Sequence, residues 1–229
     1  MIQEAFLSFK LALVQLSVSA NKEENLENAH QLVVEAARNG ANVVVLPECF
    51  NSPYGTKFFP EYAECMSDGP SLRALSDMAK EAQVYLIGGS IPEREESTGK
   101  LYNTCTVYDR QGIMIAMHRK IHLYDVDIPG KIQFQVRYRE CTFDRIGMDS
   151  CFCLRQKHYQ ENEILSPGNS LTHVNTEYGK IGIGICYDVR FPELATIAAR
   201  KGCIAMIYPG AFPLVTGPLY WELLQRSSS

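Results

Sequence analysis

Residues 42–46, with the sequence Asn-Val-Val-Val-Leu, restrict the folds open to this chain more than any other segment. A continuous run of β-branched residues has no polar face, and it is typical of a strand buried on both sides in a sheet that helices cover. Pro47 ends the run, and Glu48 follows at its carboxyl end. Because α/β folds place functional groups at the carboxyl ends of buried strands, the segment predicts an α/β fold and a candidate carboxylate.

Strand and helix patterns alternate around this run. Residues 10–18 have the pattern of a strand, and Asn21 with Glu24 three residues later forms a capping-box-like start for a helix. A second helix is predicted to start at Ser71, and residues 84–91 are predicted to form the next strand. The order strand–helix–strand–helix–strand indicates a layered α/β sheet.

The second half of the chain adds a hairpin and further strand–helix units. Residues 101–108 and 113–118 flank a predicted turn at 109–112, so we expect a β-hairpin and a mixed sheet. The later predicted elements are a strand at 180–186, a helix at 192–199, a strand at 203–208 and a short helix at 218–225. Residues 136–160 have no regular period, and we interpret them as an irregular insert within a single domain that spans residues 1–229.

The bulk composition argues against several functional classes. The net charge of −4 and the lack of a Lys/Arg cluster argue against a nucleic-acid partner. No apolar run is long enough to span a membrane, so we expect no membrane partner. Residues 1–10 carry an acid and no basic stretch, which makes them a poor secretory signal. Eight cysteines in such a chain predict reduced thiols in a cytosolic type of compartment.

Cys186 is the main candidate for a nucleophile. It ends the strand pattern at 180–186, and Pro192 begins a helix pattern shortly after it. A thiol between a strand and a turn can project from the rim of a sheet, and its pKa can be lowered, as a nucleophile requires. The competing interpretation is a buried structural cysteine, which is the commoner role of a free cysteine and which position alone favours.

Glu48 and Lys120 are the other candidates for catalysis. Partial burial would raise the pKa of Glu48 and make it a usable general base, and an ammonium at Lys120 could stabilise an oxyanion. Taken alone, each residue is better interpreted as part of a solvated surface. His118 and His122 flank Lys120 and leave a Cys–His dyad open as a second mechanism.

The irregular segment also raises the alternative of a metal or redox site. It contains a Cys-x-Cys pair with further candidate ligands nearby, namely Cys141, Cys151, Cys153 and His158. Their spacing is not a standard zinc pattern. We therefore predict no metal site.

Three separated motifs resemble the signatures of the nitrilase, or carbon–nitrogen hydrolase, superfamily. They are Leu46-Pro47-Glu48, Arg119-Lys120-Ile121-His122-Leu123 and Gly184-Ile185-Cys186-Tyr187-Asp188-Val189-Arg190-Phe191. Further segments, at 47–55, 59–64, 86–93 and 208–212, resemble its omega-amidase branch, also called nitrilase homologue 2. The resemblance implies a four-layer α-β-β-α sandwich of two mixed sheets, and it makes Cys186 the expected nucleophile.

The resemblance also implies a reaction. It is the hydrolysis of the side-chain amide of 2-oxoglutaramate or 2-oxosuccinamate to the 2-oxo dicarboxylate and ammonia, through a thioester on Cys186. In the family mechanism Glu48 is the general base, and Lys120 with the backbone N–H of Tyr187 stabilises the oxyanion. The second glutamate of the family matches Glu161 in this chain. No metal or organic cofactor is implied, and the expected partner is a small-molecule amide.

Two further residues and two departures from the family pattern bear on activity. Arg190 and Tyr54 are interpreted, from charge and location alone, as holding the substrate carboxylate. Residues 136–160 precede Glu161 directly, where the family has almost no intervening chain. Family members also continue past the position that matches Arg226, so we expect a sandwich that is incomplete at its C-terminal end.

Three functional hypotheses follow from the sequence. The first is an omega-amidase, and the second is another amidase of the superfamily that acts on a different acyl group. The third is an inactive or unstable form that acts, if at all, by binding partners. The resemblance further implies a homodimer and a cytoplasmic, in part mitochondrial, location.

Overall fold

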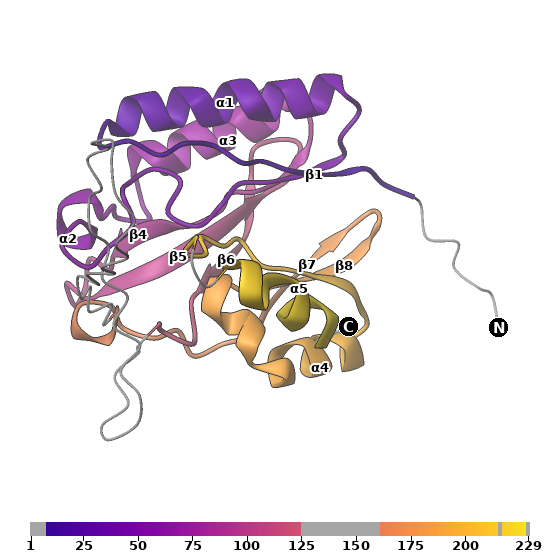
Figure 1. Cartoon of the computed structure of the whole chain (residues 1–229). Coiled ribbons are helices and arrows are strands. Elements are labelled where there is room, and N and C mark those ends of the chain that lie inside the picture. The colour runs from indigo at the N-terminus through magenta and orange to yellow at the C-terminus, as the bar shows by residue number, and fades with distance from the viewer. Residues whose placement is uncertain (1–7, 125–160, 215–216, 228–229) are drawn as a thin grey trace, which may run out of the picture.

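Two mixed β-sheets and the helices that cover them make up the fold (Figure 1). The computed structural model describes residues 8–124, 161–214 and 217–227. The insert predicted at 136–160 lies outside the described residues, and so do the candidate metal ligands within it.

The larger sheet holds six strands in the order β1-β2-β3-β5-β4, with β6 paired to β5. Its strands are β1 (Leu11–Leu13), β2 (Val43–Val45), β3 (Tyr85–Ile87), β4 (Ile91–Arg94), β5 (Leu101–Tyr108) and β6 (Met114–Arg119). β1, β2 and β3 run parallel, whereas β3, β4 and β6 each pair antiparallel with β5. The sheet is therefore mixed, and β5 with β6 forms the predicted hairpin.

A smaller sheet and the helices complete the described fold. In this sheet β8 pairs antiparallel with β7 and parallel with β9. The remaining elements are β7 (Thr172–Thr176), β8 (Gly179–Ile183), β9 (Cys203–Ile207), α1 (Lys22–Arg38), α2 (Phe59–Tyr62), α3 (Pro70–Ala82), α4 (Pro192–Arg200), α5 (Gly217–Ser227) and the short 3-10 helices η1 (Glu161–Glu163) and η2 (Cys186–Arg190). Figure 1 shows α1 and α3 on one side of the molecule and α4 and α5 on the other, as the four-layer prediction requires.

The three valines of β2 show why this strand needs apolar residues on both faces. Val44 packs with the helices, in one core with Leu75 of α3. Val43 and Val45 point the other way, into a second core that contains Ile181 of β8. Because successive side chains of a strand alternate between the two faces, β2 contributes to both cores and has no face for a polar residue.

The strand predicted for residues 84–91 is in fact two strands. β3 ends at Ile87 and β4 begins at Ile91, with Gly89 between them at a φ of 63°. This backbone conformation favours glycine. A Cβ atom on Gly89 would also lie 2.2 Å from the carbonyl oxygen of Pro47. The turn therefore packs closely against the end of β2, next to Glu48.

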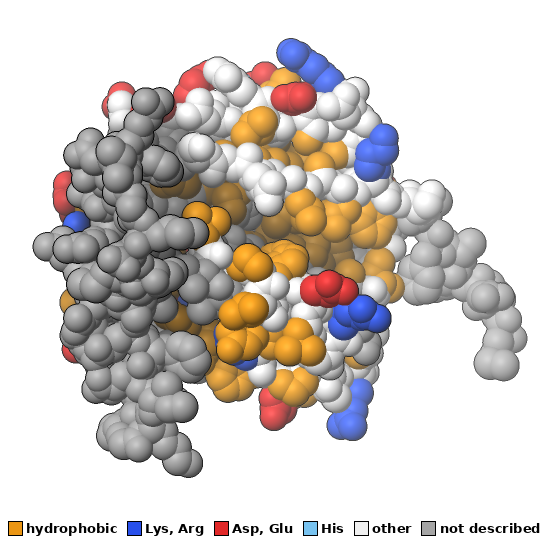
Figure 2. Space-filling view, viewed as in Figure 1, with side chains coloured by type: hydrophobic (Ala, Val, Ile, Leu, Met, Phe, Trp, Pro, Cys, Tyr) orange, Lys and Arg blue, Asp and Glu red, His pale blue; other side chains and the backbone are white. Residues whose placement is uncertain are grey.

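β1 and α5 expose large apolar side chains. The strand predicted for residues 10–18 covers only Leu11–Leu13, and its position at the sheet edge leaves Leu13 69% exposed. Leu219 and Leu223 of α5 are also mostly exposed. Figure 2 shows hydrophobic side chains gathered across the middle of the face that includes both elements. None of the helices in the described ranges is both long enough and apolar enough for a membrane span.

Candidate active site

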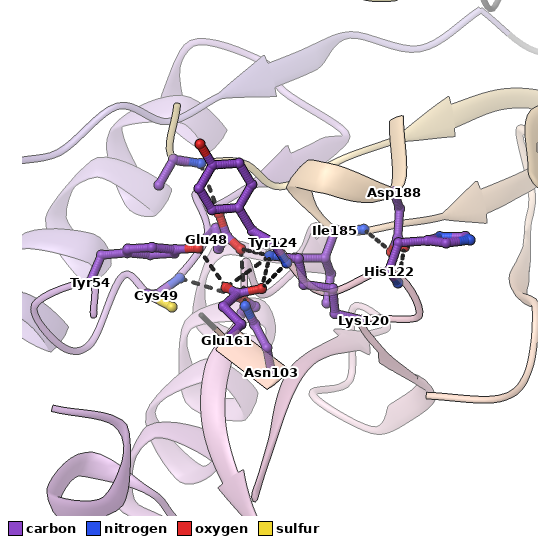
Figure 3. A network of polar contacts seen from close by, with 12 residues as sticks. Glu48, Cys49, Tyr54, Asn103, Lys120, His122, Tyr124, Glu161, Ile185 and Asp188 are labelled. Carbon is purple, nitrogen blue, oxygen red and sulfur yellow. Dashed lines mark hydrogen bonds and ion pairs between the residues drawn. The ribbon is translucent and has the colours of Figure 1, made fainter. Parts of the chain in front are cut away.

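A buried ammonium between two carboxylates forms the centre of the site (Figure 3). The Nζ atom of Lys120 lies 3.0 Å from Oε1 of Glu48 and 2.9 Å from Oε2 of Glu161. The side chains of Lys120 and Glu48 are fully buried, and that of Glu161 is nearly so. Buried charges are costly unless they are paired, so a buried group of three indicates a functional site.

Each of these charged residues lies at the end of a secondary-structure element. Glu48 lies beyond the carboxyl end of β2, Lys120 follows β6, and Glu161 begins η1. The backbone N–H of Lys120 donates to the carbonyl oxygen of Asn103 on β5, at 2.8 Å. The structure thus brings together three residues predicted from the sequence, although residues 136–160 separate Glu161 from the other two along the chain.

Neutral donors hold the Glu48 carboxylate. The side-chain amide of Asn103 donates to Oε1 at 3.0 Å, and the backbone N–H of Ala211 donates to Oε2 at 3.1 Å. Neither residue was predicted from the sequence to be part of the site. Asn103 is a polar residue in the middle of β5, every residue of which is buried, and that contrast is the signal that could have identified it.

Glu161 is held by three groups. The Tyr54 hydroxyl donates to Oε1 at 2.5 Å, the Tyr124 backbone N–H donates to Oε2 at 2.6 Å, and Lys120 is within 3.0 Å of both oxygens. The sequence analysis interpreted Tyr54 as a substrate-binding residue. The structure places its hydroxyl on Glu161, which positions that carboxylate.

Cys186 lies in the turn after β8. β8 ends at Ile183, so the strand predicted for residues 180–186 is too long. Cys186 begins η2 with a φ of 44°, in the left-handed region, and its backbone N–H donates to the carbonyl oxygen of Pro209 at 2.8 Å. The residue as a whole is partly exposed, and its buried thiol interacts with the Glu48 carboxyl group. The thiol of Cys186 therefore lies beside a buried carboxylate.

Burial and charge set the proton affinities of the site. Burial raises the pKa of Glu48, the charge of Lys120 opposes this shift, and the charge of Glu161 adds to it. The sequence predicted a lowered pKa for Cys186. The structure gives the opposite direction, because burial and then the Glu48 charge raise it. Burial alone would lower the pKa of Lys120, but the two carboxylates reverse that effect and keep the ammonium charged. Glu48 is therefore a carboxylate of raised pKa beside the thiol.

A pocket opens beside the thiol. Its lining consists of Tyr54, Tyr124, Cys186, Tyr187, Arg190, Ala211, Phe212 and Pro213. The Arg190 guanidinium lies 5.3 Å from the ring centroid of Tyr187 and 4.8 Å from that of Tyr220 on α5. Arg190 thus brings a cation to the pocket wall.

The two histidines near Lys120 contact a carboxylate. The rings of His118 and His122 lie 3.3 Å and 2.8 Å from the side-chain oxygens of Asp188. The Cys–His dyad kept open by the sequence has no support in these contacts, since both rings face Asp188. In the described ranges, no three His, Cys, Asp or Glu side chains are grouped so that they could hold a metal ion.

Comparison with known proteins gives close relatives. The family model described as carbon–nitrogen hydrolase matches residues 10–229. Hydrolase C26A3.11 from Schizosaccharomyces pombe is 53% identical over 228 residues, which make up 99% of this chain and 62% of that protein. The chain therefore spans less than two thirds of the length of this relative. Omega-amidase NIT2 from Mus musculus is 53% identical over 220 residues, which make up 96% of this chain and 70% of that protein.

Solved structures show the same fold. Saccharomyces cerevisiae Nit3, a member of branch 10 of the nitrilase superfamily, matches with a TM-score of 0.78 and 40% sequence identity, over 98% of this chain and 73% of that chain. The Caenorhabditis elegans protein NitFhit matches with a TM-score of 0.77 and 26% identity, over 96% of this chain and 48% of that chain. The arrangement of two mixed sheets with outer helices is thus shared with these proteins.

Proposed function

The chain belongs to the carbon–nitrogen hydrolase family, and we propose that it is an omega-amidase that hydrolyses the side-chain amide of 2-oxoglutaramate or 2-oxosuccinamate. The observation that carries the proposal is the buried Lys120 ammonium between Glu48 and Glu161, next to a pocket that Cys186 lines. A thiol, a base and a cation are the groups that acyl transfer from an amide requires. Likeness to the omega-amidase NIT2 of mouse supports this choice of substrate.

Acylation begins when Glu48 takes the thiol proton and the sulfur of Cys186 attacks the amide carbon. The carbonyl oxygen becomes an oxyanion, which the Lys120 ammonium and the backbone N–H of Tyr187 stabilise. Tyr187 is the second residue of η2, where an N–H group has no acceptor within the helix. Glu48 then passes its proton to the amide nitrogen, the C–N bond breaks, ammonia leaves, and a thioester remains.

Deacylation uses the same groups with water as the nucleophile. Glu48 takes a proton from water, and the oxygen bonds to the thioester carbon while Lys120 again stabilises the oxyanion. The C–S bond breaks, the thiolate of Cys186 takes the proton back from Glu48, and the acid is released. Glu161 orients Lys120 throughout, through contacts of both its oxygens with Nζ.

Arg190 is proposed to bind the free carboxylate of the substrate, because its guanidinium lines the pocket and can bind a carboxylate in a bidentate way. Replacing it with methionine keeps side-chain bulk against the Tyr187 ring and removes the charge. We expect Arg190→Met to raise the KM for 2-oxoglutaramate by at least about 10-fold. Hydrolysis of a neutral amide by the same variant is the matched control, and the KM for that amide should not rise. An equal loss for both amides would contradict this role.

The experiment that tests the proposed reaction is ammonia release from 2-oxoglutaramate by the purified chain and by Cys186→Ala. We expect release by the parent chain and a loss of at least about 1,000-fold in the variant. A folded parent chain that hydrolyses other linear amides but not 2-oxoglutaramate would indicate a different acyl group. A folded parent chain without any amidase activity would contradict the proposal and favour an inactive form.

We also propose, from the family resemblance, that the chain forms a homodimer and is located in the cytoplasm and in part in mitochondria. Light scattering after size-exclusion chromatography tests the dimer, and a monomer at micromolar concentration would contradict it. Fractionation of cells that express the chain tests the location.

A further inference from the structure

The side chain of Asp188 is fully buried and joins two segments of the site (Figure 3). One oxygen accepts the backbone N–H of His122 at 2.8 Å and lies 2.8 Å from Nδ1 of the same residue. The other accepts the backbone N–H of Ile185 at 2.9 Å and lies 3.3 Å from Nε2 of His118. The proposed mechanism uses none of these groups.

The partners of Asp188 lie close to the reacting residues along the chain. Asp188 is two residues after Cys186, and its partner Ile185 is the residue directly before the cysteine. His118 and His122 are two residues before and two residues after Lys120. A single buried carboxylate therefore fastens the turn that carries the thiol to the segment that carries the ammonium.

The backbone at Cys186 requires such support. Its φ of 44° lies in the left-handed region, which a residue with a side chain rarely adopts and which persists only when the surroundings fix it. The side chain of Asp188 binds the N–H of Ile185 on one flank of Cys186, and the backbone N–H of Asp188 donates to the Ile185 carbonyl at 2.9 Å. These bonds close the turn around the cysteine.

The charge of Asp188 suits this arrangement. Burial alone would raise the pKa of this carboxyl, but hydrogen bonds from His118 and from the N–H groups of Ile185 and His122 lower it. Tyr208 also faces the carboxylate, and its pKa is raised to about 12 by burial and by the charge of Asp188. The carboxylate is thus ionised at neutral pH and accepts from the backbone N–H groups of His122 and Ile185.

We propose that Asp188 is a positioning residue, which sets the distance between the Cys186 sulfur and the pair Glu48 and Lys120 by fastening their two segments together. The proposal rests on the proposed function only in taking Cys186 as the nucleophile. Replacement by asparagine keeps the shape but places an NH₂ group where donors converge. At least one of the four contacts is then a clash between donors, and the turn has to shift.

The test compares Asp188→Asn with Glu64→Gln in the full chain. Glu64 is the matched control because it is also a buried carboxylate that accepts a backbone N–H, from Ser71 in the first turn of α3, at 2.8 Å. The main readout is the rate at which iodoacetamide alkylates Cys186 in the folded protein between pH 6 and 9, measured on the Cys186 peptide by mass spectrometry. This rate needs no natural substrate, so it is independent of the proposed substrate.

We expect alkylation of Cys186 in Asp188→Asn to be slower by about 10- to 100-fold, with an altered pH profile. Its kcat should fall by a similar factor, while its KM stays close to that of the parent chain. Glu64→Gln should lower the unfolding midpoint and leave the alkylation rate unchanged. If Asp188→Asn alkylates at the parental rate and only its unfolding midpoint falls, Asp188 has a purely structural role and the proposal is wrong.

A second variant, His122→Phe, tests the link if Asp188→Asn does not fold. The His122 ring stacks on Phe191 at 3.5 Å between centroids, and phenylalanine can keep this stacking and the backbone N–H. Only the Nδ1 contact with Asp188 is removed. We expect alkylation of Cys186 to slow by about fivefold. An unchanged rate in this folded variant would overturn the proposed link between the two segments.

Discussion

Two buried glutamates, Glu64 and Glu48, are each paired with a lysine, but they are paired in different ways. Lys22 lies 2.7 Å from Glu64 and keeps a quarter of its side chain exposed. Glu64 also accepts from the Ser71 backbone N–H at 2.8 Å and from the Ser71 hydroxyl at 2.7 Å. One cation and several neutral donors thus satisfy one carboxylate, which links the start of α3 to Lys22 at the start of α1.

Glu48 shares its cation with a second carboxylate. Lys120 is fully buried and contacts both Glu48 and Glu161, and the thiol of Cys186 interacts with Glu48. The pKa of Glu48 is raised by burial, and the Glu161 charge adds to the shift. The comparison shows that the balance of charge around a buried carboxylate, and not the presence of a lysine, differs between the two pairs, and excess negative charge favours proton uptake by the carboxylate.

The largest expected effect comes from replacing the two glutamates and comparing kcat. Glu48→Gln removes the base beside the thiol and keeps the side-chain shape, so we expect kcat for amide hydrolysis to fall by about 1,000-fold. Glu64→Gln should leave kcat of the folded protein unchanged. Steady-state ammonia release at equal concentrations of folded protein measures both values. Similar losses in the two variants would mean that the two glutamates do not differ in function.

An effect of similar size, on stability, is expected when the lysines are replaced. Lys120→Met leaves two buried carboxylates without a cation, so we expect the free energy of unfolding to fall by about 3–5 kcal/mol. Lys22→Met removes a partly exposed partner, and we expect a loss below about 1 kcal/mol. Urea unfolding measures both changes.

A double variant tests why Lys120→Met should lose stability. If the loss in Lys120→Met comes from repulsion and unpaired charge, adding Glu161→Gln should recover part of the stability without restoring activity. A double variant that is no more stable than Lys120→Met would contradict this explanation.

The ends of strands made Glu48, Lys120 and Cys186 candidates from the sequence, and the resemblance of three motifs to one family turned these candidates into predicted site residues. Glu48 could be identified because a run of apolar residues on both faces of β2 ends immediately before it. Cys186 follows a similar end after β8, and Lys120 follows β6. β2 and β6 end at one edge of the larger sheet, where strand ends lie close together. β8 belongs to the smaller sheet, which shares a core with β2, so the position of Cys186 also depends on how the two sheets pack. Glu161 needed the family resemblance, because the residues before it have no regular period.

The supporting contacts could not be predicted in this way. Asn103 and Ala211 each act through one hydrogen bond to Glu48, and Asp188 acts through several contacts. These contacts depend on how the loops pack rather than on any period in the sequence. The direction of the Cys186 pKa shift was missed for the same reason, since burial and the Glu48 charge outweigh the effect expected of a turn. The strand predicted at 84–91 was wrong because a close backbone contact, at Gly89, decides the turn.

The smallest expected effect concerns pH, and it compares Glu48 with Asp188. The folded pKa of Glu48 is raised above its ordinary value of 4.5, so the stability that this group contributes is present below that value and is lost as pH rises through the folded pKa. The folded pKa of Asp188 is lowered from its ordinary value of 3.8, so its contribution is present above that value and is lost as pH falls through the folded pKa.

The two carboxylates are therefore distinguished by two curves against pH, each the free energy of unfolding of a variant minus that of the parent chain. The free energy of unfolding of Glu48→Gln, relative to the parent chain, should rise as pH increases from about 4.5 towards neutrality, by about 1.4 kcal/mol for each unit of pKa shift. The deficit of Asp188→Asn should instead shrink as pH falls below 3.8. Urea unfolding between pH 3 and 8 measures both curves. If the Glu48→Gln curve instead falls as pH rises towards 4.5 and is flat above that value, Glu48 is held as a stabilised carboxylate, like Asp188, and it is too weak a base to accept the thiol proton.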